Sequence, residues 1–243
     1  MLLENEVIRA GKKRSPTTVR HYLISLSHLF TIAVRDWEWL QENPMDKVSK
    51  PKPTRGRQRY LSEDERNALI AEAKKSQCPF LYPIVVLALS TGMRRGEIMN
   101  LKISDIDLKH QRIDLKASKN DEPRAIPLKG LALKLISDIW EERRCLKLSE
   151  LLFPSPTNPA KPYDIETSWQ SALKRANIQD FRFHDNRHSN ASIHASQGRS
   201  LLEICQSLGH KSQQTTKRYA HLAYEHTAKM AEELDKEIFG ENL

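Results

Sequence analysis

Two stretches of the chain place histidine, arginine and tyrosine side chains where they can act on a phosphate group. The stretch "HDNRHSNAS" has His184 and Arg187 three positions apart, a spacing that shares one face of a helix. The stretch "LGHKSQQTTKRYAH" has His210 directly after a glycine and Tyr219 nine residues later, with basic residues between them. A tyrosine hydroxyl is a poor nucleophile at neutral pH, so its position among cations indicates that the phenol is activated.

Two further cations lie earlier in the chain. The stretch "TGMRRGEI" has Arg94 just after the glycine that ends an apolar run, and "ASKND" has Lys119 in a turn-rich segment. In the transition state of phosphoryl transfer, negative charge is spread over the equatorial oxygens of the phosphate. Preorganised hydrogen-bond donors aimed at that charge contribute a large part of the rate enhancement. Arginine suits this task because its planar fork stays charged and binds two oxygens together. The set therefore predicts phosphoryl transfer in which arginines and a histidine replace a metal ion, and a lysine protonates the departing oxygen.

Together the four stretches resemble the motifs of the tyrosine recombinase family, also called phage integrases, which includes the Xer-type site-specific recombinases. Their order and spacing match over roughly residues 58–227. The resemblance implies that the tyrosine attacks a DNA phosphate, forms a 3′-phosphotyrosyl bond and frees a 5′ hydroxyl. A 5′ hydroxyl from another strand then reverses the step. Because the adduct keeps the bond energy, the resemblance implies no ATP, no metal and no other cofactor.

The resemblance also implies a role for each candidate residue. Six residues are expected to bind one phosphate and to move its protons: Arg94, Lys119, His184, Arg187, His210 and Tyr219. Within this set Tyr219 is the nucleophile, Lys119 is the general acid for the leaving hydroxyl, and His184 assists proton transfer to or from the phenol. The other three bind the phosphate. Glu97 is expected to orient Arg94 through an ion pair.

Other interpretations of some positions stay open. Lys116 is a second lysine beside the turn, three residues from Lys119. His184 and His188 are four residues apart, a spacing that suits two metal ligands. However, "HDNRH" lacks the glutamate of the zinc-protease motif HExxH, and Arg187 repels a cation. We therefore expect no metal site and interpret His188 as a core or hydrogen-bonded histidine.

Two positions depart from the family pattern. Asn186 stands where the family usually has leucine, and Asn190 stands where an aromatic residue is common. Neither position is one of the chemical positions. We therefore expect these two departures to affect packing more than catalysis.

The hydrophobic pattern predicts a mainly α-helical chain with a small antiparallel β-sheet, an α+β arrangement. Ser15 with Pro16 marks the start of one helix, and Ser62 with Glu65 forms a capping box at the start of another. A buried helix is expected to end at Gly92. Further helices are expected over residues 128–144, 163–176 and 226–239, and short antiparallel strands within residues 103–115 and 123–128.

A basic segment divides the chain. "KVSKPKPTRGRQR", residues 47–59, combines two prolines and a glycine with many lysines and arginines, so it is expected to be an extended linker. Residues 1–46 are then a partial helical domain, similar to the second half of the SAM-like core-binding domain with which the family closes around DNA. Residues 60–243 are expected to be the catalytic domain.

Composition and charge agree with a DNA-binding protein. The 243 residues carry a formal net charge of +8 and a pI near 9.4, which suits the phosphate backbone of double-stranded DNA. No apolar run reaches the roughly 20 residues needed to span a bilayer, and we see no signal peptide, so the cytoplasm is expected. The three cysteines are widely spaced without a CxxC motif, and buried free thiols are expected.

The sequence therefore predicts a site-specific DNA recombinase. By resemblance it acts as a homotetramer on paired DNA sites, with the helix from His226 onward passed to a neighbouring subunit. A second hypothesis is a shortened integrase that binds DNA without completing recombination. A third is a type IB topoisomerase, which shares the chemistry but relaxes supercoils without a specific site.

Overall fold

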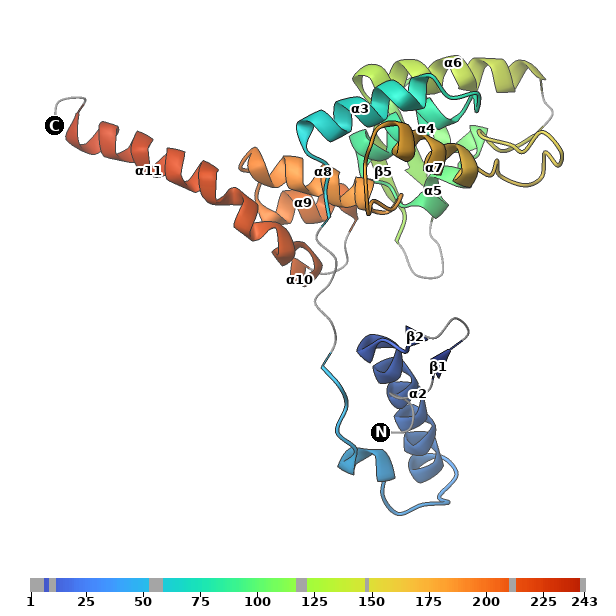
Figure 1. The fold of residues 1–243 in the computed structure, drawn as a ribbon, viewed down its shortest axis with the longest axis vertical. Coiled ribbons are helices and arrows are strands. Elements are labelled where there is room, and N and C mark those ends of the chain that lie inside the picture. The colour runs from blue at the N-terminus through green and yellow to red at the C-terminus, as the bar shows by residue number, and fades with distance from the viewer. Residues whose placement is uncertain are drawn as a thin grey trace. The chain divides into compact units, whose positions relative to one another are not determined.

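The protein is described by a computed structural model, in which its chain divides into two units, Met1–Arg57 and Gln58–Leu243. Each unit is considered by itself (Figure 1). The residues that the structure describes are 7–8, 12–52, 59–116, 122–146, 149–209 and 213–240.

The first unit is built around one long helix, α2 (Pro16–Arg35). As predicted, Ser15 caps this helix, because its hydroxyl accepts a hydrogen bond from the N–H of Thr18 at 3.1 Å. Of the helix residues only Val19 and Ala33 are buried, and several large apolar side chains on it are exposed. Three short elements flank the helix: β1 (Val7–Ile8), β2 (Lys12–Lys13) and the 3₁₀ helix η1 (Pro44–Lys47).

The second unit packs helices around a small sheet. Its helices are α3 (Glu63–Lys74), α4 (Leu81–Thr91), α5 (Arg95–Met99), α6 (Gly130–Leu146), α7 (Glu166–Arg175), α8 (Asp185–Ser196), α9 (Leu201–Leu208), α10 (Gln213–Thr216) and α11 (Tyr224–Phe239), with the 3₁₀ helices η2 (Ile103–Asp105) and η3 (Lys217–Ala223). Helix α4 is apolar on nearly every side and therefore buried, as a helix without a polar face must be. It packs against α3, α6 and α8, so it forms the centre of the unit.

The sheet of this unit has three antiparallel strands in the order β3-β4-β5. The strands are β3 (Ile106–Asp107), β4 (Arg112–Leu115) and β5 (Arg124–Pro127). Ile113 lies opposite Ile126, and both side chains are buried in the core. The predicted fold class, mainly α-helical with a small antiparallel sheet, is confirmed.

Two helix boundaries that the sequence predicts are confirmed, the capping box at the start of α3 and the end of α4 at Gly92. In the capping box of α3, the hydroxyl of Ser62 accepts from the N–H of Glu65 at 3.2 Å, and the Glu65 carboxylate accepts from the N–H of Ser62 at 3.0 Å. Helix α4 ends at Gly92 and α9 ends at Gly209, with φ values of +62° and +64°. Glycine enters this left-handed region at little steric cost. The two glycines turn the chain directly into two of the predicted motifs.

All three cysteines are free. Cys78 and Cys205 are buried as expected, whereas Cys145, near the end of α6, is exposed, so the prediction of buried thiols is wrong at that position. In the part of the chain that the structure describes, no helix is both long enough and apolar enough to cross a membrane.

Candidate active site

Arg187 on α8 is the central cation of the site. Its side chain is buried, and it donates to the carbonyl oxygen of Gly92 at 2.7 Å from Nη1 and to that of Leu208 at 2.5 Å from Nη2. Burial, reinforced by the charge of Arg94, lowers the pKa of Arg187 to about 10. The guanidinium therefore stays charged at neutral pH. It ties α8 to the ends of α4 and α9.

Glu97 joins Arg94 to a second arginine. Its carboxylate accepts from the backbone N–H of Arg94 and from Nη1 of Arg94, both at 2.8 Å, so the expected ion pair is present. The same carboxylate accepts from Nη2 of Arg124, at 2.8 and 2.9 Å. One acid therefore holds two cations, one on the N-terminal side of α5 and one on strand β5.

Sequence reasoning missed Arg124. The side chain of Arg124 also packs against Gly209, where an added Cβ would lie 2.8 Å from both Cδ and Nε of the arginine. The basic residue in "PRAIPL" was visible, but its partner Glu97 lies 27 residues earlier, in another element. No local pattern marks such a pair.

Tyr219 on η3 is buried between α8 and α9. Its ring belongs to a small apolar cluster, and only 5% of the residue is exposed. Its hydroxyl is hydrogen-bonded to Nδ1 of His188. Burial raises the pKa of Tyr219, while the charges of Arg218 and Arg187 lower it. The phenol therefore lies within electrostatic reach of the buried guanidinium.

His188 and His184 form a pair of rings beside the phenol. Their centroids are 5.5 Å apart and their planes are nearly perpendicular, at 87°. Burial, together with the charge of His184, lowers the pKa of His188 to about 4, so the imidazole is neutral at neutral pH. Burial and the nearby Arg187 also lower the pKa of His184. The prediction of a hydrogen-bonded His188 is confirmed, although the sequence did not identify Tyr219 as its partner.

Among the described residues, no three histidine, cysteine, aspartate or glutamate side chains are grouped closely enough to hold a metal ion. Nδ1 of His188 is already occupied by the phenol of Tyr219. The charges of Arg187 and Arg218 also lower the pKa of His188, so the surroundings of this ring are electropositive.

The two asparagines that depart from the family pattern each donate hydrogen bonds from the side-chain amide to backbone carbonyl oxygens. Nδ2 of Asn190 donates to the carbonyl oxygens of Leu89 at 2.8 Å and Ser90 at 3.2 Å, at the end of α4. Nδ2 of Asn186 donates to the carbonyl oxygen of Phe183 at 2.8 Å. Both amides are buried. These bonds agree with the expected effect on packing.

Two predicted site residues, Lys119 and His210, lie outside the described residues. A pocket of about 500 Å³ lies between α5 and the sheet, and its lining includes Arg94, Glu97 and Arg124 together with Lys116, the alternative turn lysine. The lining of the pocket therefore includes both arginines, Arg94 and Arg124, and residues at the ends of β4 and β5, the two strands between which Lys119 lies in the sequence.

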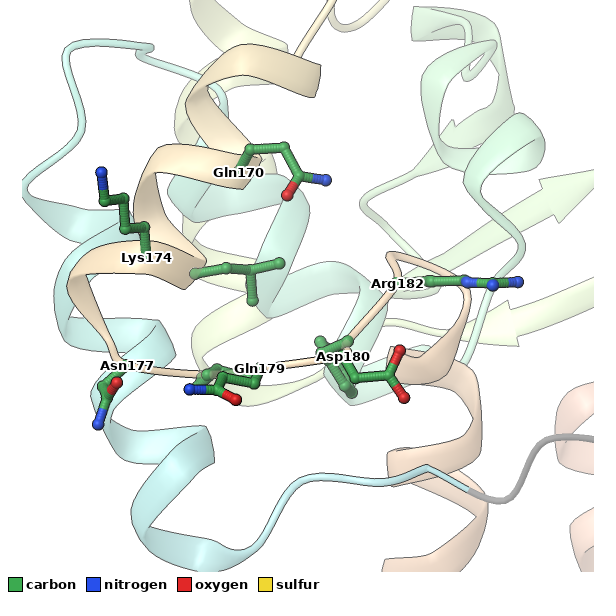
Figure 2. A pocket seen from close by; sticks show the side chains of 9 residues that line it. Gln170, Lys174, Asn177, Gln179, Asp180 and Arg182 are labelled. Atoms are coloured by element: carbon green, nitrogen blue, oxygen red, sulfur yellow. The ribbon is translucent and has the colours of Figure 1, made fainter. Parts of the chain in front are cut away.

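A second pocket, of about 440 Å³, lies beside the end of α7. Figure 2 shows its polar side chains, which come from α7 and from the segment that follows it: Gln170, Lys174, Asn177, Gln179, Asp180 and Arg182. None of the four described members of the predicted catalytic set, Arg94, His184, Arg187 and Tyr219, lines it.

The sequence of residues 59–226 matches the profile of the phage integrase family. The chain belongs to the phage integrase family. The integrase of Salmonella phage P22 is 32% identical to this integrase-family chain over 259 residues, which cover 99% of the chain and 65% of the relative. The shufflon-specific DNA recombinase of Escherichia coli is 34% identical over 215 residues, which cover 88% of the chain and 53% of the relative. The chain thus spans less than two thirds of the length of either relative.

The fold agrees with this membership. The structure of the XerH site-specific recombinase bound to palindromic difH substrate matches with a TM-score of 0.72 and 21% identity, covering 89% of this chain and 67% of that one. The resemblance to tyrosine recombinases inferred from four short stretches is confirmed. Members of the phage integrase family are enzymes that cleave and rejoin DNA strands.

Proposed function

We propose that the protein is a site-specific DNA recombinase that cleaves and rejoins strands through a covalent bond between Tyr219 and a 3′ phosphate. The observation that carries the proposal is the proximity of a buried phenol to a buried guanidinium: Tyr219 belongs to the same apolar cluster as Leu208, and Arg187 donates to the carbonyl oxygen of Leu208. Tyr219 and Arg187 each influence the pKa of the other, and the charge of Arg94 lowers the pKa of Arg187. Membership of the phage integrase family supports the same chemistry.

The arginines provide the phosphate site. Arg187 is anchored by two backbone carbonyl oxygens, which use two of the five N–H donors of a guanidinium. Arg94 is oriented by Glu97. Without a ligand the two cations repel each other, and a bound phosphate offsets that repulsion with its own charge. His210 completes the set of phosphate ligands.

The reaction is an exchange of phosphate esters. The oxygen of Tyr219 attacks phosphorus as the bond from phosphorus to the 5′ oxygen breaks, and Lys119 gives its proton to the departing oxygen. His184 assists the removal of the phenolic proton. The 5′ hydroxyl of a second strand then attacks the phosphotyrosine and restores the free phenol. The number of phosphodiester bonds is unchanged, so no energy source is consumed.

Double-stranded DNA is the proposed substrate. The net charge of +8 favours a polyanion, and the matching XerH structure is of a protein bound to its difH substrate. The base sequence of the target site is recognised by side chains that contact base edges in the grooves, separately from the residues that act on the phosphate.

We further propose assembly as a homotetramer on paired DNA sites through α11. This helix runs away from the rest of its unit (Figure 1), and its exposed apolar side chains are Met230, Leu234, Ile238 and Phe239. Met230, Leu234 and Ile238 are spaced four positions apart, so they share one face of the helix. A neighbouring subunit that covers this face would bury it. A form lacking residues 229–243 should fail to assemble on DNA in size-exclusion chromatography, and equal assembly would contradict the proposal.

The decisive experiment traps the covalent complex. The substrates are nicked duplexes, both those that tile the DNA bordering the coding sequence and those selected for binding from a random-sequence library. The nick lets a short fragment diffuse away, so the adduct cannot reverse. The adduct should vanish in Tyr219→Phe, persist in Tyr224→Phe, and form on the order of 10²–10³-fold more slowly in Arg94→Ala. An adduct in Tyr219→Phe would refute the nucleophile assignment.

Two outcomes separate the rival functions. A protein that binds DNA or cleaves it but never exchanges strands between two cognate sites would be an incomplete integrase. A protein that relaxes supercoiled plasmid of arbitrary sequence as a monomer would be a topoisomerase.

A further inference from the structure

We propose that His188, not His184, is the base that takes the proton of Tyr219 when the phenol attacks phosphorus. The inference rests on the proposed function and assigns one of its steps to a residue. It also reorders His184 and His188, because His184 then acts behind His188 and not directly on the nucleophile.

The geometry connects nucleophile and base directly. The hydroxyl of Tyr219 is hydrogen-bonded to Nδ1 of His188, and the two ring centroids are 6.0 Å apart. With His188 as the base, Nδ1 takes the acceptor role, so that the hydroxyl of Tyr219 donates and Nε2 carries the ring proton. A general base must lie within hydrogen-bond reach of the proton that it removes, and His188 meets this condition before DNA binds.

His184 is not the histidine to which the hydroxyl of Tyr219 is hydrogen-bonded in the described part of the chain. Within the described residues, the hydrogen bond of the phenol is made to His188, and the ring of His184 lies nearly perpendicular to the ring of His188 with a centroid distance of 5.5 Å. The three groups are therefore ordered as Tyr219, His188 and His184. In this order His184 acts on the phenol through His188, whose pKa it lowers.

The charges around His188 determine when it can act. The groups that influence it are His184 at the N-cap of α8, Asp185 and Arg187 on α8, and Arg218 and Tyr219 on η3. Burial and the positive neighbours favour the neutral ring, which is the form that accepts a proton, and only Asp185 acts in the opposite direction. A DNA phosphate bound beside the arginines adds negative charge and therefore raises the pKa of His188 in the complex. The ring becomes a stronger base when the substrate is present.

The proton balance of the step is complete. The bond from the Tyr219 oxygen to phosphorus forms and the bond from phosphorus to the 5′ oxygen breaks, while the phenolic proton moves to Nδ1 of His188 and Lys119 protonates the departing 5′ oxygen. In the rejoining step the attacking 5′ hydroxyl returns a proton to Lys119, and the phenolate leaves phosphorus and recovers its proton from the imidazolium of His188. No oxidant, reductant or other co-reactant is required.

The test compares two matched asparagine variants. His188→Asn keeps an acceptor oxygen near the position of Nδ1 but cannot hold a proton, and His184→Asn makes the same change one turn earlier. Single-turnover adduct formation on the nicked duplexes should slow on the order of 10²–10⁴-fold in His188→Asn. The loss in His184→Asn should be smaller. DNA affinity and the melting temperature should remain close to those of the wild type in both variants.

Two further readouts distinguish a base from a residue that only supports the fold. The wild-type rate should fall at low pH as His188 becomes protonated, and His188→Asn should lose this dependence. A ring-fluorinated tyrosine in place of Tyr219 has a more acidic phenol that depends less on a base. It should therefore recover part of the rate lost in His188→Asn, whereas a variant with a damaged fold would gain nothing.

The outcomes separate this inference from the proposed function. If the wild type forms no adduct, the proposed function fails, and the base assignment fails with it. If the wild type forms the adduct and His188→Asn forms it within about threefold of the same rate, only the base assignment fails. A larger loss in His184→Asn than in His188→Asn would also overturn the proposed order. If His188→Asn does not fold, His188→Gln with the fluorinated phenol provides the same comparison, and the absence of any recovery there refutes the assignment.

Discussion

The guanidinium of Arg187 is hydrogen-bonded to the carbonyl oxygen of Leu208, with 2.5 Å between Nη2 and the oxygen. Leu208 is the last residue of α9, and His210 follows two residues later. A second donor of the same guanidinium reaches the carbonyl oxygen of Gly92, two residues before Arg94. One buried cation therefore positions the starts of both segments that carry the other proposed phosphate ligands.

Arg187→Met should destabilise the fold as well as abolish adduct formation. The substitution leaves two buried carbonyl oxygens without their charged donor, and each such bond contributes about 1.5–3 kcal/mol. Relief of the repulsion from Arg94 offsets part of this loss, so we expect a net decrease of about 3 kcal/mol in the free energy of unfolding. Urea denaturation measures it.

The matched control for this prediction is Arg95→Met. The side chain of Arg95 is 40% exposed and pairs with Glu166 at 2.7 Å. Because an exposed ion pair contributes about 1 kcal/mol at most, its loss should change stability little. Equal losses in the two variants would show that the buried carbonyl contacts do not stabilise the fold.

Gly92→Ala should be destabilising, whereas Gly96→Ala should not. Gly92 has φ +62°, and an added Cβ would lie 2.4 Å from Cδ2 of Leu208 and 2.9 Å from Oδ1 of Asn190. At Gly96, within α5, an added Cβ meets nothing within 4 Å. We expect a loss of about 1–3 kcal/mol at the first site and a gain of up to about 1 kcal/mol at the second. Thermal unfolding of the two variants checks both signs.

The sequence predicted those features that are local. Capping at Ser62, the helix end at Gly92 and the helical spacing of His184 and Arg187 all depend on residues within a few positions of each other. The contact of Tyr219 with His188 spans 31 residues and depends on how η3 packs on α8. Such a contact leaves no trace in local periodicity.

Burial on α2 shows a related limit. Apolar spacing predicts that a helix has a face to bury, but it does not specify what covers that face. Tyr22, Leu26 and Leu29 are 40–50% exposed in the first unit, although the spacing of the apolar residues is helical. Arg124 was missed for the same reason, because its role depends on Glu97, which only the packing of the folded chain brings next to it.

Glu97→Gln and Arg124→Ala should act as one unit. Arg94 loses its charged partner in the first variant, and Glu97 loses one of its two cations in the second. Each variant should slow adduct formation by loosening Arg94, and the double variant should be little worse than the more impaired single one. A double-mutant cycle on adduct rates should therefore give a coupling of about 0.5–3 kcal/mol. Additive losses would mean that Arg124 does not act through Glu97.

The burial of His188 should make stability depend on pH. Its pKa is lowered to about 4 in the folded protein, against about 6.5 in an unfolded chain. Between these values the unfolded state binds more protons, so the free energy of unfolding should fall as the pH decreases from about 6.5 toward about 4. His184 and His194, whose pKa values are also lowered, act in the same direction. Carboxylates with lowered pKa values, such as Glu65, contribute mainly below this window.

His188→Asn should therefore have a shallower pH dependence than the wild type. Urea denaturation at about pH 7 and about pH 5 compares the two slopes, and the histidines left in the variant explain the slope that remains. Identical slopes would indicate that His188 is as free to protonate in the folded protein as in the unfolded chain. That result would contradict the proposed role of Nδ1 as acceptor from the phenol of Tyr219, because a ring protonated on both nitrogens has no acceptor nitrogen.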